Sequence, residues 1–73
     1  MVYGKRRENE KAIAEFELAI DITPYNARSY MNLGLIYYQM GDKEKARKMW
    51  EKALFIDPQF SDAERALQLL NKN

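Results

Sequence analysis

The sequence of 73 residues contains neither cysteine nor histidine. The chain therefore cannot form disulfides, and it lacks the usual ligands of a zinc site and the thiol or imidazole of many catalytic sites. Catalysis would have to use paired carboxylates or an activated lysine. The acidic residues instead fall on expected helix faces and at helix ends. We predict no enzyme, no catalytic residues, no metal and no cofactor.

An excess of one charge and long apolar runs are also missing. Lys and Arg number 12 against 11 Asp and Glu, which gives a net charge of +1. This balance gives no support for nucleic-acid or anionic-membrane partners. No apolar run approaches the roughly 18 residues of a membrane span, and residues 1–7 lack the apolar core of a signal peptide. We expect a cytoplasmic protein.

Glycine and proline are few, and most of them mark boundaries. The chain has three glycines and two prolines. The residue before a proline is pushed out of the α region, so helices should end before Pro24 and Pro58. Gly41 suits the left-handed position after a helix. With the spacing of the apolar residues, these boundaries predict four helices over 5–21, 27–40, 43–56 and 62–70.

Capping residues support the predicted starts. Asn26 and Asp42 are good N-caps for the second and third helices. Ser61 and Glu64 have the spacing of a capping box for the fourth. The loops are short, which favours antiparallel neighbours, and no segment has a strand pattern. The fold class is therefore all-α.

The second helix is apolar on more than one side. Leu33, Ile36 and Tyr37 follow helical spacing, and Met31, Leu35 and Tyr38 form a second stripe. A helix with two apolar stripes is packed from several directions. This segment should be the centre of the fold.

The chain matches itself at one fixed spacing. Four pairs carry the comparison: Ala12 with Ala46, Phe16 with Trp50, Ala19 with Ala53, and Pro24 with Pro58. Several matches at one spacing indicate a repeated structural unit.

This spacing resembles that of the tetratricopeptide repeat family, whose unit is a helix–turn–helix of about 34 residues. Over residues 27–60 the family pattern is matched by Tyr30, Leu33, Gly34, Tyr37, Ala46, Trp50, Ala53 and Pro58. Half a repeat precedes this unit, with Ala12, Phe16, Ala19 and Pro24 at the matching positions. After it, Glu64, Gln68 and Asn71 replace the aromatic, glycine and tyrosine, as in a polar capping helix. The resemblance implies a short α-hairpin solenoid, as a single domain over 1–73 or as a piece of a longer array.

The resemblance also implies a concave face that binds peptides. The matching positions are Arg28, Met31, Asn32, Leu35, Tyr38 and Gln39 on the second helix, and Asp62, Arg65, Leu69 and Lys72 on the fourth. Met31, Leu35 and Tyr38 would form an apolar seat for a peptide. Alternatively, the fourth helix or a second molecule covers this strip.

The first helix lacks the partner that a full unit would provide. Ile13, Phe16 and Ile20 should therefore be left partly bare, and exposed apolar patches usually mark an interface. Two copies could cover each other as a dimer, or the chain could belong to a longer array. We predict a protein-interaction module that acts as a scaffold or self-assembly unit with a protein or peptide partner. The alternative is a nucleic-acid-binding helical repeat, which the charge balance disfavours.

Overall fold

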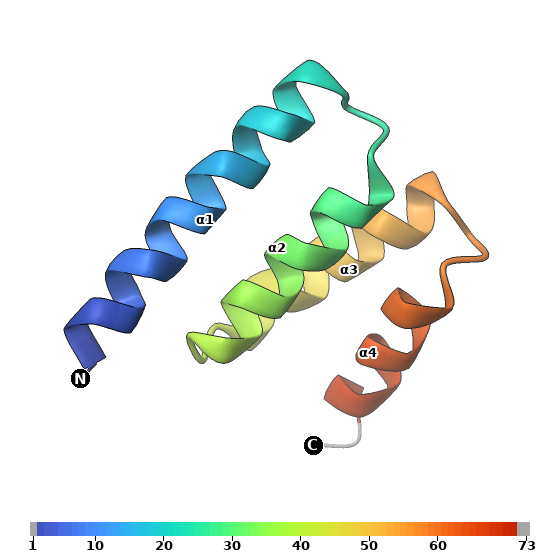
Figure 1. Cartoon of the computed structure of the whole chain (residues 1–73). Helices are drawn as coiled ribbons and strands as arrows, with labels where there is room; N and C mark the ends of the chain where they lie inside the picture. Colours follow the sequence, from blue (N-terminus) through green and yellow to red (C-terminus); the bar gives the residue numbers. More distant parts are fainter. Residues whose placement is uncertain (1, 72–73) are drawn as a thin grey trace.

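The computed structural model describes the backbone of residues 2–71 and the side chains of residues 7–71. This part of the chain forms four helices: α1 (Val2–Ile22), α2 (Ala27–Gln39), α3 (Lys43–Ile56) and α4 (Ser61–Asn71) (Figure 1). Residues 2–71 include no strand, which confirms the predicted all-α class. In the same stretch, no helix is long and apolar enough to cross a membrane.

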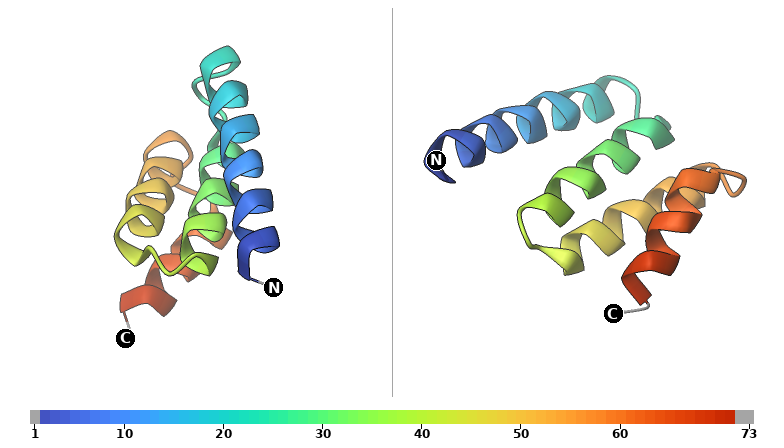
Figure 2. Two further views of the ribbon diagram at one scale, coloured as in Figure 1. Left: turned by 90° about the vertical axis from the view of Figure 1, so that its left-hand side faces the viewer. Right: turned by 60° about the horizontal axis from the view of Figure 1, so that its bottom comes forward.

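The helices form a flat slab. Each helix makes its main contacts with the next one along the chain, and α1 and α4 lie on opposite sides of the α2–α3 hairpin (Figures 1 and 2). The slab measures 36 × 34 × 15 Å. The shortest of these extents is less than half of either of the others. Both broad faces are therefore close to solvent.

One short connection ends α2 and begins α3. Gly41 has φ +89°, and its N–H donates to the carbonyl of Tyr38 at 3.0 Å. The Asp42 N–H donates to the carbonyl of Tyr37 at 2.9 Å, which completes a Schellman motif. The side chain of Asp42 also accepts the N–H of Lys45 at 3.2 Å, as the N-cap of α3. The sequence predictions for Gly41 and Asp42 are confirmed.

The two proline loops form the same turn, one repeat unit apart. The Asn26 N–H donates to the Thr23 carbonyl at 3.2 Å, and the Phe60 N–H donates to the Asp57 carbonyl at 3.0 Å. Each turn has proline at its second position, where the ring fixes the required φ. Asn26 then caps α2 by accepting the N–H of Ser29 at 3.2 Å, as predicted.

The same register overturns the predicted capping box. Phe60 occupies the position of Asn26, and its carbonyl accepts the N–H of Glu64 at 3.2 Å. Ser61 is therefore the first residue of α4 and not its N-cap. The repeated turn sets where the helix begins, and it outweighs the local serine–glutamate pattern.

The predicted start of the first helix was also wrong. The helix begins at Val2 and not at residue 5, so Gly4 lies inside it. Glycine costs a helix about 1 kcal/mol relative to alanine, which weakens the first turn without ending it. The predicted end of the second helix was displaced as well, because α2 ends at Gln39 with Met40 as its C-cap, one residue earlier than predicted.

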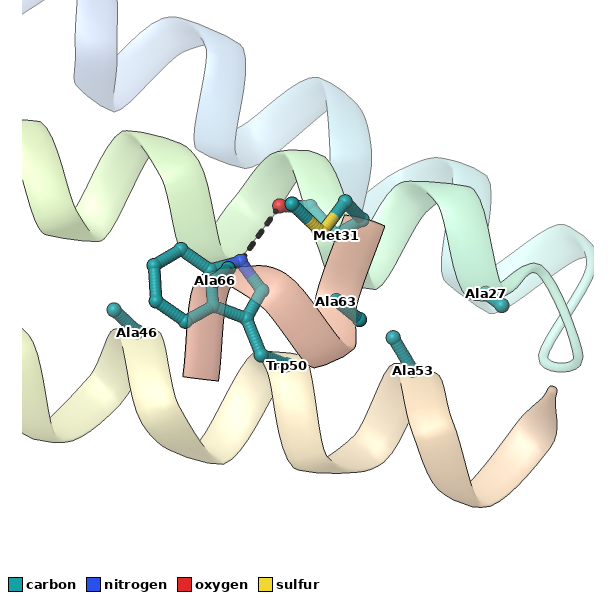
Figure 3. Packing of buried hydrophobic residues seen from close by; sticks show 7 residues of the cluster. All are labelled: Ala27, Met31, Ala46, Trp50, Ala53, Ala63 and Ala66. Atoms are coloured by element: carbon teal, nitrogen blue, oxygen red, sulfur yellow. Dashed lines mark hydrogen bonds between the residues drawn. The ribbon is translucent and has the colours of Figure 1, made fainter. Parts of the chain in front are cut away.

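The core is built from small residues around one tryptophan. Ala46, Ala53 and Ala63 have no exposed surface, and Trp50 is 2% exposed (Figure 3). The indole of Trp50 lies against Gly34, where an added Cβ would come within 2.8 Å of Cε2 and closer still to Nε1. Leu33 is buried, and Tyr30 and Tyr37 are half-buried against this core. Alanine and glycine let the helices approach closely enough to enclose the large indole.

Corresponding positions of α1 and α3 differ in burial. Ala46 and Ala53 of α3 are fully buried, whereas Ala12 and Ala19 of α1 are half-buried. The reason is the layout of the slab, because α3 contacts both α2 and α4 while the main contact of α1 is α2. Pro24 and Pro58 are both exposed in their turns.

Candidate functional site

A groove of about 370 Å³ lies between α2 and α4. Its residues come from one face of α2, from the turn before α4 and from the facing side of α4. They are Arg28, Met31, Asn32, Leu35, Phe60, Asp62, Arg65, Ala66 and Leu69. The α2 residues follow spacings of three and four, which place them on one helix face.

The concave-face positions matched from the sequence, apart from Asp62 and Lys72, number eight, and six of these line this groove. They are Arg28, Met31, Asn32, Leu35, Arg65 and Leu69. The strip of Met31, Leu35 and Tyr38 is covered only in part, because Met31 is 8% exposed whereas Leu35 and Tyr38 are each 40% exposed. Asp62, at a further matching position, also lines the groove. Lys72 lies outside the described residues.

The remaining two predicted residues, Tyr38 and Gln39, are not in the lining of the groove. The Tyr38 ring lies 5.9 Å from the Trp50 ring, tilted by 36°. Contact with the core indole therefore occupies one side of Tyr38, while its other side is exposed. Gln39 is exposed at the last turn of α2.

Phe60 is the groove residue that sequence reasoning missed. It precedes α4 and has no place in a pattern of helical faces. The repeat held the necessary signal, because Phe60 lies one repeat unit after Asn26 and so occupies the entrance of the next first helix. Ala66, on α4, was also not among the predicted groove residues, and it is 9% exposed where it reaches the groove.

The groove combines an apolar floor with a charged rim. Met31 is buried below it, and Leu35 and Leu69 rise from the two facing helices. Arg28 and Arg65 are exposed at its edge. Such a surface suits binding of an apolar side chain with a polar neighbour.

The side chains that commonly bind metal ions do not gather into a cluster in the described part of the chain. No group of three or more His, Cys, Asp or Glu side chains that could hold a metal ion occurs within residues 2–71.

The predicted self-association residues lie on α1. Ile13, Phe16 and Ile20 are all half-buried. Among the side chains of this helix that the structure describes, residues 7–22, the most exposed large apolar ones are Leu18, at 61%, and Ile22, at 75%. These two residues extend the apolar surface beyond the three that the sequence suggested.

Two sequence models of one family match the chain. The tetratricopeptide repeat model matches residues 27–60, the unit defined by the repeat spacing. A second model, described as TPR repeat, matches residues 2–41, which is more than half of the chain.

Known proteins show the same relationship. The chain is 40% identical over 78 residues to mouse tetratricopeptide repeat protein 14, covering 97% of the chain and 10% of that protein. It is 36% identical over 63 residues to cellulose synthase operon protein C of Escherichia coli K12, covering 86% of the chain and 5% of that protein. It is 34% identical over 59 residues to tetratricopeptide repeat protein 37 of Xenopus laevis, covering 80% and 4%.

The chain spans a tenth or less of the length of these curated relatives. The family matches nevertheless extend over both proline turns and the whole α2–α3 hairpin. With its four helices and its repeated turn, the chain belongs to the tetratricopeptide repeat family, whose helical hairpins mediate protein–protein interaction.

Proposed function

We propose that the chain is a protein-interaction module that holds a short peptide in the groove between α2 and α4. The observation that supports this proposal is the groove itself, which gathers six residues assigned to one concave face. Preformed apolar hollows with a few polar groups at the edge are the usual form of a ligand site.

The lining suggests the chemistry of the peptide. An apolar side chain would lie between Leu35 and Leu69, above Met31. Arg28 and Arg65 outnumber the single acidic residue of the lining, Asp62. Charge-assisted hydrogen bonds from guanidinium groups favour a carboxylate. The proposed ligand is therefore a peptide with an apolar anchor and an acidic neighbour.

Selection from a random peptide library on the immobilised chain tests the proposal. Peptides that are enriched would be measured by fluorescence polarisation against the native chain and against Leu35→Glu and Leu69→Glu. Both leucines are substantially exposed, so these variants should fold. A charge in the apolar floor should weaken binding about tenfold or more, because the anchor would meet a desolvated carboxylate.

Leu18→Glu is the matched control, since it makes the same exchange at an exposed leucine of α1. It should leave the affinity unchanged. Enriched peptides that bind Leu35→Glu and Leu69→Glu as tightly as the native chain would show that the groove is not the site.

Self-assembly is a second candidate, supported by the apolar surface of α1. Leu18 and Ile22 are exposed beside the half-buried Ile13, Phe16 and Ile20. A second copy would bury this surface in a dimer, whereas in a longer array a neighbouring helix would do so. Sedimentation across a concentration series distinguishes the two. A mass that rises with concentration and falls in a Leu18→Glu and Ile22→Glu double variant supports the dimer, and a constant monomer mass contradicts it.

We further propose that the chain binds protein and not nucleic acid, and that it has no catalytic activity. The net charge of +1 and the mixed surface support the first part. Oligonucleotide binding whose affinity falls steeply with salt would contradict it. The cytoplasmic location expected from the sequence stays a prediction.

A further inference from the structure

A second cleft, of about 410 Å³, lies where the turn between α1 and α2 meets the C-terminal half of α3. Its lining is Pro24, Tyr25, Tyr30, Lys52, Phe55 and Ile56. None of these residues belongs to the groove between α2 and α4. Tyr30 points to a different side of α2 from Arg28 and Met31, because residues one or two positions apart do not share a helix face. The α2 helix therefore contributes one face to this cleft and another face to the groove.

Two aromatic side chains of this cleft are almost fully exposed. Tyr25 is 83% and Phe55 is 84% exposed, more than any other large apolar residue in the described part of the chain. Exposed apolar surface gathered around a hollow is typical of an interaction site. Both rings are therefore accessible to a ligand in the cleft.

The repeat does not require these aromatic residues. The position equivalent to Phe55 in the preceding unit is Asp21, and the position equivalent to Tyr25 in the following unit is Gln59. The same turn forms around Pro58 with glutamine in place of tyrosine. Packing of the helices therefore does not explain the aromatic pair.

The lining also restricts the occupant. Grooves lined by aromatic rings bind extended proline-rich segments, because such segments are preformed and lose little entropy on binding. Lys52 is the single charged residue of the lining, which favours a carboxylate at one end of the ligand. We propose that this cleft binds an extended, proline-rich peptide that carries an acidic residue beside its prolines.

A second copy of the chain is a poorer occupant. A two-fold contact places the same patch on both partners, so two copies of Lys52 would enter the contact without an acidic residue of the lining to pair with them. Like charges brought together in a partly desolvated contact are unfavourable.

Fluorescence polarisation with a defined probe tests the proposal. The probe is a labelled peptide of six prolines followed by two glutamates. Two comparison peptides replace the glutamates by glutamines, or the prolines by alternating glycine and serine. The proline–glutamate peptide should saturate below about 1 mM, as expected for a small contact surface. The glutamine peptide should bind about twofold to fivefold more weakly, because an exposed ion pair contributes little.

Variants then assign the binding to the cleft. Tyr25→Gln combined with Phe55→Ala should reduce the affinity about tenfold or more, since it removes both exposed rings. Lys52→Gln should abolish the difference between the glutamate and glutamine peptides. Leu35→Glu, in the other groove, should leave the affinity unchanged, which separates this proposal from the function proposed above. Circular dichroism would verify that each variant keeps its helices.

Four results of the binding measurements would overturn the proposal. The first is a lack of saturation up to about 5 mM peptide, far above the dissociation constant expected of a small contact surface. The second is a double variant that binds as tightly as the native chain, and the third is a glycine–serine peptide that binds as tightly as the proline–glutamate peptide. The fourth is loss of binding in Leu35→Glu. A native mass that rises with concentration, and stays constant in the Tyr25→Gln and Phe55→Ala variant, would assign the cleft to a second copy and would also overturn it.

Discussion

The indole N–H of Trp50 donates to the main-chain carbonyl of Met31 at 3.2 Å, linking α3 to α2 across 19 residues (Figure 3). The side chain of Met31 contributes to the floor of the groove between α2 and α4. One buried hydrogen bond therefore joins the two helices of the hairpin at a residue that also lines the proposed peptide site. The fold and the candidate site share this residue.

Trp50→Phe should destabilise the chain by about 1–3 kcal/mol, because it removes a buried hydrogen bond and leaves a cavity. Urea unfolding followed by circular dichroism measures the loss, since the variant has no tryptophan to report by fluorescence. Tyr38→Phe is the control. It keeps a ring against Trp50 and removes only a hydroxyl from a side chain that is 40% exposed, so it should change the stability by less than about 0.5 kcal/mol.

Gly34→Ala should also destabilise the chain. Alanine gains about 1 kcal/mol of helix propensity over glycine. Against this, its Cβ would overlap the indole of Trp50, which is buried and hydrogen-bonded and cannot move aside. Overpacking of this kind costs about 1–3 kcal/mol, so the net change should be a loss.

A double-mutant cycle isolates the contact between Gly34 and Trp50. In a Trp50→Leu background, Gly34→Ala should cost less than in the native chain, because the indole that it meets is gone. Equal costs in the two backgrounds would show that the close approach of the indole does not explain the glycine.

Gly41→Ala tests the backbone of the α2–α3 turn. No atom lies within 4 Å of a Cβ added at Gly41, so only its φ of +89° opposes a side chain. The expected loss is about 1–2 kcal/mol in the free energy of unfolding. Gly41→Asn should lose less, because asparagine adopts left-handed conformations more readily than alanine. If both variants have the same urea midpoint of unfolding as the native chain, the turn does not depend on glycine.

Ala19→Leu and Ala53→Leu form a matched pair at equivalent positions of the repeat. Ala53 is fully buried between helices, and Ala19 is half-buried on α1. The leucine at position 53 should cost about 1–3 kcal/mol by overpacking, and the leucine at position 19 should cost clearly less. Thermal unfolding of the two variants gives the comparison. A loss at position 19 as large as that at position 53 would mean that α1 is as tightly packed as α3.

Local signals predicted most of the fold. Asn26, Gly41 and Asp42 act within their own turns, so their roles follow from neighbouring residues alone. The prediction of Ser61 as an N-cap was wrong because the serine–glutamate pattern competed with the turn around Pro58. That turn fixed the start of the helix one residue earlier. The predicted start of the first helix at residue 5 was wrong because a single residue of low helix propensity, Gly4, does not stop a helix that its neighbours propagate.

The site was less predictable because it depends on contacts between helices. Helical spacing placed Met31 and Leu35 on one face, and the structure places both in the groove. Spacing does not report that Tyr38, on the same line, lies against Trp50. The cleft around Tyr25 and Phe55 joins a turn to a helix that is distant in sequence, so no single pattern predicts it.

The order of contacts along the slab has a mechanical consequence. Each helix rests mainly on the next helix in the chain, α1 on α2, α2 on α3 and α3 on α4. Such local contacts favour fast folding and allow an end helix to open before the rest. A pull on the two ends would put the same force on all of these interfaces, and they would open one after another from the weakest, so the chain would lengthen in steps before any helix had to unwind.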